Sequence, residues 1–115
     1  MLSFQSLDSY QVAIQFLAIA LEVVRQLPRG HADDGDQLRR AAKSVARNIA
    51  EGAGRSTPAD KAKHYTIARG EAMECACSFD VMLLERTITA EQHQRGLEFL
   101  ERVVSMLTKM IGKPV

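Results

Sequence analysis

The sequence predicts an all-α protein built as an antiparallel, up-down-up-down four-helix bundle. Apolar residues recur at spacings of three and four over four segments of about 20 residues, and no window alternates with period two. Only three prolines and seven glycines occur, and most of them cluster at a few points, so long uninterrupted helices are favoured. Because the connections are short, consecutive helices should pack side by side in opposite directions, as one domain over residues 1–115.

The first segment is expected to be helical from about Ser9 to Leu27, where Pro28 and Gly30 end it. Its main apolar face consists of Val12, Phe16, Ile19, Ala20, Val23 and Leu27. A second apolar face beside it consists of Ile14, Leu17, Leu21 and Val24. A surface helix normally shows one apolar stripe about 100° wide, so this segment carries more apolar surface than a single bundle needs.

The second segment is expected to begin near Asp34 or Asp36, because Asp34 stands three residues before Gln37, the spacing of a capping box. It should end at Gly52 or Gly54, where a residue that tolerates positive φ can close the last turn.

The third segment should open at Thr57, with Pro58 in the first turn, where its missing N–H costs nothing. Asp60 adds a favourable negative charge there, and the helix should run to about Arg86. Its apolar residues fall on one conventional stripe: Tyr65, Ala68, Ala72, Cys75, Ala76, Phe79, Met82 and Leu83.

The fourth segment should start at Thr89, which forms a second capping box with Gln92, and should end before Gly112. Its apolar residues form two adjacent stripes: Leu97, Leu100, Val104, Leu107 and Ile111, with Phe99, Val103, Met106 and Met110 beside them. Large apolar surfaces left in water mark interfaces, so the first and fourth segments together predict a homo-oligomer.

The overall charge is close to neutral, with 15 Lys and Arg against 14 Asp and Glu, and gives no global attraction to nucleic acid. No stretch approaches the roughly 20 apolar residues that span a bilayer, and the first residues lack a signal-peptide pattern. Cys75 and Cys77 point about 200° apart around a helix axis, so we expect two reduced thiols and no disulfide. These features predict a cytoplasmic protein with no membrane partner.

A cluster of cations lies on the second segment: Arg39, Arg40, Lys43 and Arg47, with Arg55 just beyond its end. Such a cluster could hold phosphates of RNA or DNA without regard to sequence. It could equally be a solvated face or the partner of acidic residues on a neighbouring subunit. The chain has no tryptophan and few aromatics for base stacking, so we prefer the structural interpretation and keep nucleic-acid binding as the alternative.

A polar stripe runs beside the apolar face of the second segment and consists of Gln37, Ser44 and Asn48, with Glu51 at its edge. Glu74 lies on a comparable polar line of the third segment, with Glu71, Ser78 and Glu85. Buried polar groups need hydrogen-bond partners, so we expect Arg40 or Asn48 to face Glu74 and to fix the register of the two helices.

The sequence offers no catalytic, metal or cofactor motif. Di-iron bundles use Glu-x-x-His, but none of His31, His64 and His93 follows a glutamate by three positions. Neither G-x-S-x-G nor H-E-x-x-H occurs. We therefore expect a protein that is not an enzyme.

The block from Gln37 to Arg55 resembles the four-helix-bundle proteins named after intervening sequences in bacterial 23S ribosomal RNA. The matching positions are Gln37, Leu38, Arg40, Ala41, Ser44, Asn48, Ile49, Ala50, Glu51, Gly52, Gly54 and Arg55. Ala68, Gly70 and Glu74 match a second family segment, in which Glu71 replaces the usual serine.

The resemblance implies an up-down bundle that assembles as a ring, a homopentamer, with no enzymatic activity established for the family. A relative of that family, the accessory protein of diversity-generating retroelements, is similar in fold and pentameric form and works with nucleic acid and a reverse transcriptase. The resemblance thus implies this chain itself as first partner, and either an unidentified protein or nucleic acid as second.

Overall fold

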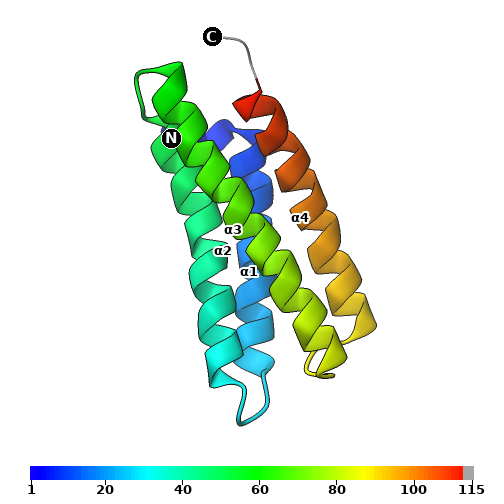
Figure 1. The fold of residues 1–115 in the computed structure, drawn as a ribbon. Coiled ribbons are helices and arrows are strands. Elements are labelled where there is room, and N and C mark those ends of the chain that lie inside the picture. Colours follow the sequence, from blue (N-terminus) through cyan, green and yellow to red (C-terminus); the bar gives the residue numbers. More distant parts are fainter. Residues whose placement is uncertain (113–115) are drawn as a thin grey trace.

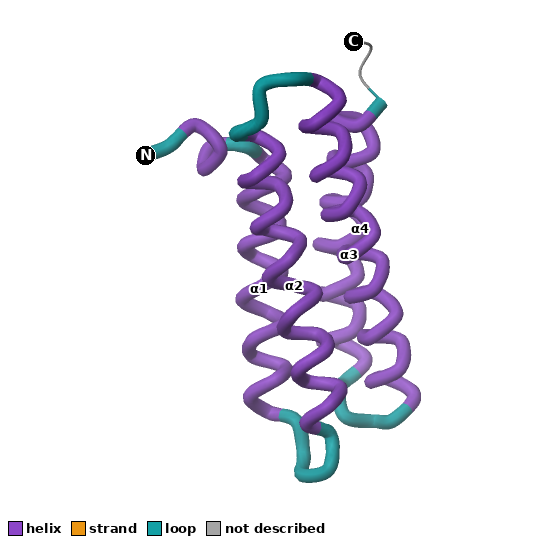
Figure 2. Tube along the Cα trace, turned by 60° about the vertical axis from the view of Figure 1, so that its left-hand side comes forward, coloured by secondary structure: helices purple, strands orange, loops and turns teal. Residues whose placement is uncertain are grey.

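The computed structural model describes residues 1–112 and confirms the all-α fold. A short 3-10 helix, η1 (Ser3–Ser6), precedes four α-helices: α1 (Asp8–Gln26), α2 (Ala32–Ala53), α3 (Pro58–Leu84) and α4 (Ala90–Ile111). The helices lie side by side as long rods, and the chain reverses direction at each short loop (Figures 1 and 2). Each helix packs against two others, so that α1 contacts α2 and α4, and α3 contacts the same two.

Side-chain contacts between α2 and α3 show that these helices are antiparallel. Gln37 Nε2 donates to Glu74 Oε1 over 3.4 Å, and Asn48 Oδ1 lies 3.3 Å from His64 Nδ1. Residue numbers therefore rise along α2 while they fall along α3.

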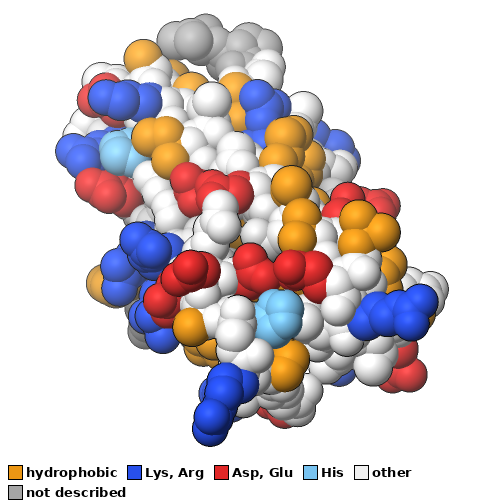
Figure 3. Space-filling view, turned by 60° about the horizontal axis from the view of Figure 1, so that its bottom comes forward, with side chains coloured by type: hydrophobic (Ala, Val, Ile, Leu, Met, Phe, Trp, Pro, Cys, Tyr) orange, Lys and Arg blue, Asp and Glu red, His pale blue; other side chains and the backbone are white. Residues whose placement is uncertain are grey.

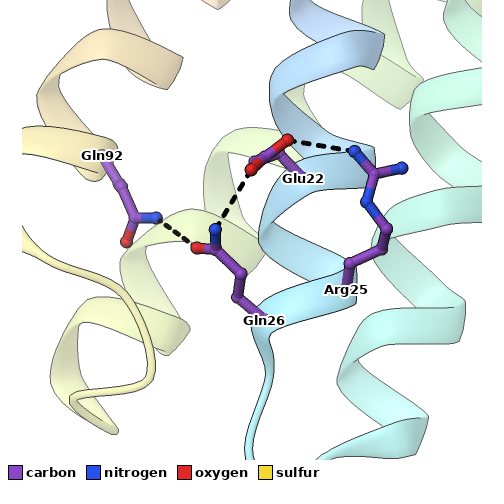
Figure 4. A network of polar contacts seen from close by, with 4 residues as sticks. All are labelled: Glu22, Arg25, Gln26 and Gln92. Carbon is purple, nitrogen blue, oxygen red and sulfur yellow. Dashed lines mark hydrogen bonds and ion pairs between the residues drawn. The ribbon is translucent and has the colours of Figure 1, made fainter.

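A polar network joins the end of α1 to the start of α4 (Figure 4). Glu22 accepts hydrogen bonds from Arg25 over 3.0 Å and from Gln26 over 3.1 Å. The amide oxygen of Gln26 accepts in turn from Gln92 Nε2 over 3.2 Å. The end of α1 thus meets the start of α4, as an up-down arrangement requires.

The core runs through the middle of the bundle and is centred on two phenylalanines. The rings of Phe16 and Phe79 lie 5.5 Å apart between centroids. The other large, fully buried side chains are Val23, Leu38, Val45, Ile49, Cys75, Met82, Leu100, Val103 and Leu107. Alanines 41, 42, 46, 68 and 72 are buried with them on α2 and α3.

The start of α2 differs from the prediction, because the helix begins at Ala32 and the capping box at Asp34 does not form. His31 occupies the N-cap position without a side-chain cap bond, and its carbonyl accepts from the N–H of Gly35 over 3.1 Å. A Cβ on Gly35 would lie 3.0 Å from Leu27, so the first turn packs directly on the end of α1. Tertiary packing extends the helix beyond its local start signal, and Asp34 then sits in the first turn, where a negative charge is favourable.

The end of α2 lies at the predicted place, but for another reason. Gly54 is the C-cap with a φ of −84°, so no positive φ is used. Gly52 is buried, and a Cβ there would lie 2.7 Å from the ring of Tyr65. Glycine at position 52 is therefore required by the close approach of α3.

The starts of α3 and α4 confirm the sequence prediction. Thr57 Oγ1 accepts from the N–H of Asp60 over 3.1 Å, with Pro58 in the first turn. Thr89 and Gln92 exchange the two hydrogen bonds of a capping box, over 3.0 Å and 2.8 Å.

The end of α3 is closed by a residue with a left-handed backbone. Arg86 has a φ of +61°, and its N–H donates to the carbonyl of Leu83 over 3.1 Å. The N–H of Thr87 donates to the carbonyl of Met82 over 3.0 Å. This pair of bonds is the Schellman pattern, in which glycine normally holds the left-handed position.

Candidate interaction surfaces

A polar seam joins α2 and α3. The residue bonded to Glu74 is Gln37, whereas we expected Arg40 or Asn48. Asn48 instead donates to the carbonyl of Ser44 over 2.9 Å and to its hydroxyl over 3.0 Å. Its carbonyl side faces His64, which the sequence analysis had not assigned to this stripe.

Beside this seam lies an open acidic groove of about 600 Å³ between α2 and α3. Four carboxylates and one guanidinium line it, together with Gln37, Ala41 and Ser44; the charged residues are Asp33, Asp36, Arg40, Glu71 and Glu74. Partial burial, and then the charge of Glu74, raise the pKa of Glu71 above its ordinary value. The groove therefore carries an excess of negative charge.

The predicted basic cluster is interleaved with acids. Arg39 pairs with Asp36 over 2.8 Å, and Arg55 pairs with Glu51 over 2.7 Å. Glu51 therefore belongs to this ion pair at the end of α2. Its carboxylate and that of Asp36 interrupt the row of cations.

Three cations of the cluster have no such partner. Within residues 1–112, no carboxylate oxygen lies within 4 Å of the charged nitrogens of Arg40, Lys43 or Arg47. Arg40 is held loosely by the carbonyl of Asp36, 3.4 Å from its Nε. The structure thus divides the five predicted cations into two that are paired and three that remain open to a partner.

The outward face of α3 is apolar, a feature that the sequence analysis missed. Its exposed apolar side chains are Ile67 (41% exposed), Met73 (53%), Val81 (41%) and Leu84 (84%). We call these four residues the α3 stripe. At about 100° per residue they fall within roughly 120° of one another around the helix axis.

The apolar excess predicted on the first and fourth helices is mostly covered. Of the second face of α1, Ile14 is 39% exposed, whereas Leu17, Leu21 and Val24 are half-buried. On α4, Val103 is buried and the other members of the two stripes are buried or half-buried. Apart from Met1 and Leu2 at the start of the chain, the large exposed apolar side chains of residues 1–112 therefore lie on α3, with Ile14 as the corresponding residue on α1.

One acid–histidine cluster joins the start of α2 to the end of α3. His31 Nδ1 lies 3.5 Å from Asp34 and 4.0 Å from Glu85. Hydrogen bonding to Asp34 is the largest cause that raises the pKa of Glu85. These three are the described residues whose ligand atoms could together contact a metal ion, since all lie within 4.8 Å of one another. Their geometry is also that of an ordinary ion-pair cluster, and the prediction of no metal site stays a prediction.

A hollow of about 690 Å³ opens at the end of the bundle where α1 and α3 begin and α4 ends. Apolar side chains dominate its wall, among them Leu7, Tyr65, Met106 and Met110. The hydroxyl of Ser9 is buried there without a hydrogen-bond partner among the described residues. Burial raises the pKa of Tyr65 above its ordinary value.

The two cysteines occupy different environments, and both are free thiols. Cys75 is fully buried, and burial together with Glu71 and Glu74 raises its pKa to about 12. Cys77 is exposed and lies on the outward side of α3 between Met73 and Val81. Of the helices in the described part of the chain, none has the length and apolar character needed to cross a membrane.

The sequence model of the 23S rRNA-intervening sequence protein family matches residues 5–109. The match covers most of the chain, and the protein therefore belongs to this family. The recognition made from the Gln37–Arg55 block is confirmed. No curated protein matches the sequence.

A crystal structure of a protein of unknown function from the S23 ribosomal protein family of Bacteroides thetaiotaomicron is similar in fold. The two share 20% sequence identity with a TM-score of 0.85, and the match covers 91% of this chain and 99% of the other. At this identity the likeness shows the fold alone.

Proposed function

We propose that this member of the 23S rRNA-intervening sequence protein family is a non-enzymatic homo-oligomer that acts as a structural or protein-interaction module. The observation that carries the proposal is the set of apolar side chains on the surface of a single chain, above all the α3 stripe. Apolar area removed from water contributes about 25 cal/mol per Å², before the cost of association is subtracted. Covering the stripe with another molecule therefore lowers the free energy.

The family resemblance of the Gln37–Arg55 block supports a ring of five copies. Sedimentation velocity and light scattering test this number directly. The expected mass is about five times the chain mass of 12.7 kDa. A mass of 12.7 kDa that persists from micromolar to millimolar concentration would reject the proposal.

Nucleic-acid binding is the second candidate function, and the observation that favours it is the trio Arg40, Lys43 and Arg47 without carboxylate partners. Each phosphate contact should make the slope of log affinity against log salt more negative by about 0.9 for duplex DNA. A gel-shift titration with single-stranded RNA and duplex DNA, repeated with the triple alanine variant of these residues, measures that slope. Binding at low salt that the variant loses would support this function, and no binding at low salt would reject it.

A further inference from the structure

The α3 stripe extends along much of one helix. From Ile67 to Leu84 it spans 17 residue steps, or about 25 Å at 1.5 Å per residue. This length is suited to contact with another helix rather than with a small molecule. The stripe lies on the side of α3 turned away from its buried face, which holds Phe79 and Met82.

Gly70 lies on the same line as the stripe and indicates that a second backbone approaches there. It stands in the middle of α3, where glycine costs about 1 kcal/mol relative to alanine. A Cβ at this position would meet nothing within 4 Å, and the φ of Gly70 is not positive. Neither packing nor backbone conformation within the chain therefore requires a glycine, and a close approach from outside would explain it.

The edge of the stripe toward α2 is acidic. Glu71 and Glu74 belong to the groove between α2 and α3, in which four carboxylates surround one guanidinium. Figure 3 shows acidic side chains in the middle of the molecular surface with hydrophobic side chains among them, and Lys and Arg nearer the margins. A partner that covers the α3 stripe would therefore meet excess negative charge along one side.

A surface of matching chemistry lies along α1 and α2. Ile14 is exposed on α1, with Leu17 and Leu21 half-buried beside it. This line continues to Val24, which lies next to Gly35 at the start of α2.

Gln37 and Asn48 of α2 face α3. At about 100° per residue, Lys43 and Arg47 lie on the side of α2 opposite its buried residues, where Lys43 is half-buried and Arg47 is exposed. Neither cation has a carboxylate within 4 Å among residues 1–112. The α1–α2 face, defined by Ile14, Leu17, Leu21, Lys43 and Arg47, is thus apolar and basic, whereas the α3 face is apolar and acidic.

We propose that the α3 stripe of one copy docks on the α1–α2 face of the next copy, with Gly70 at the point of closest approach. In this contact the carboxylates of the acidic groove meet Lys43 and Arg47 of the neighbour. The contact joins two different faces, so it is heterologous: each added copy leaves one face of each kind free, and a ring forms when the rotation closes. This inference rests on the proposed homo-oligomeric function and specifies its interface.

Two single substitutions, each blocking one face, test the pairing. Met73→Glu places a charge on the α3 stripe, and Ile14→Glu places one on the α1–α2 face; both side chains are exposed, so the fold should persist. Each variant alone should elute at the single-chain mass of 12.7 kDa. An equimolar mixture should form a 1:1 dimer and nothing larger, because one intact contact remains. Arg102→Glu, at an exposed position of α4 that does not share a hollow with Met73, is the control and should assemble like the wild type.

The outcomes separate this inference from the proposed function. A wild type that assembles, with Met73→Glu assembling equally well, would overturn the α3 contact and leave homo-oligomerisation standing. If Ile14→Glu assembles while Met73→Glu remains at the single-chain mass, α3 contacts α3 of the next copy. This result would overturn the heterologous pairing. A wild type that is a single chain would reject the proposed function itself.

Gly70→Arg provides a test that does not depend on removing an apolar side chain. Because nothing lies within 4 Å of a Cβ at this position, the single chain should keep its helical circular dichroism while assembly is lost. A Gly70→Arg variant that assembles with unchanged affinity would overturn the close approach at this position.

Lys43→Glu tests the charge component of the contact. It should raise the dissociation constant at least tenfold at low salt, with a smaller difference at high salt, where charges are screened. An unchanged dissociation constant at low salt would overturn the pairing of the acidic groove with Lys43.

Discussion

α3 and α4 lie side by side and bury one face each in the same core, yet their outward faces differ in kind. The exposed side of α4 carries Glu98, Glu101, Ser105 and Lys109, as expected for a helix surrounded by water. The exposed side of α3 carries Ile67, Met73, Val81 and Leu84. Two helices that make equivalent contacts within one chain can therefore present different kinds of surface to the outside.

The glycines of the two helices show the same contrast. Gly96 is on the buried side of α4, where a Cβ would overlap the ring of Phe79. Gly70 is on the exposed side of α3, where a Cβ would meet nothing within 4 Å. The first glycine serves packing inside the chain, and we assign the second to packing between chains.

The largest expected effect separates the two sides of α3. Phe79→Ala should lower the free energy of unfolding by about 3–5 kcal/mol, because it empties the centre of the core. Met73→Ala should change the free energy of unfolding of the dissociated chain by less than about 0.5 kcal/mol, because the side chain is already exposed. Urea unfolding of the dissociated chain measures both, and comparable losses would show that Met73 is packed within its own chain.

The two glycines should respond to alanine with opposite signs. Gly96→Ala should cost about 1–3 kcal/mol, because the added methyl group overpacks the Phe79 ring. Gly70→Ala should stabilise the dissociated chain by about 1 kcal/mol through helix propensity alone. Thermal unfolding of each variant at low concentration is the measurement, and a destabilised Gly70→Ala chain would reveal a role for this glycine within the monomer.

The backbone conformations at the ends of α3 and α4 also differ. Arg86 has a φ of +61° at the end of α3, whereas Gly112 has a φ of −80° at the end of α4. Arg86→Gly should therefore stabilise the chain by about 1 kcal/mol, because it removes the cost of a left-handed side chain. Glu85→Gly, one residue earlier in a right-handed conformation, is the control and should not stabilise; equal effects would contradict the backbone argument.

The smallest effect concerns Glu71 and depends on pH. Its pKa is raised in the folded chain, so folding favours the protonated form; its contribution to stability is present at acid pH and is lost as pH rises through the raised value. Glu71→Gln should leave stability at pH 4 nearly unchanged and increase that of the dissociated chain at pH 7. In the assembly, cations of the neighbour should abolish this gain. Urea unfolding at the two pH values, on the Ile14→Glu background and on the wild type, measures the difference.

Features that depend on neighbouring residues in the sequence could be predicted well. The starts of α3 and α4 are set by Thr57 and Thr89, whose cap bonds involve residues only three positions away. The start of α2 could not be predicted this way, because Gly35 packs on Leu27 from another helix. The partner of Glu74 depends on the register between α2 and α3, which a linear pattern does not contain.

The α3 stripe was missed for a related reason. Val81 and Leu84 stand in one apolar run with the buried Met82, and Ile67 and Met73 each stand next to a buried alanine, so the sequence does not mark these four residues as exposed. They can be recognised as one surface only when it is known which side of α3 faces the core. The apolar excess on the first helix was visible in the sequence, but Leu17, Leu21 and Val24 are half-buried within the chain, and Val24 lies beside Gly35 of α2.

The hollow at one end of the bundle is lined both by Leu7, just before α1, and by Ile111, the last residue of α4. The first and last helices thus meet at the same end, as they must when four rods alternate in direction. A circularly permuted chain that links these ends and opens between Gly54 and Ser56 would keep every helix-to-helix contact. Its first and last helices would then be α3 and α2, held together by the hydrogen bonds of Gln37 and Asn48 instead of by a loop.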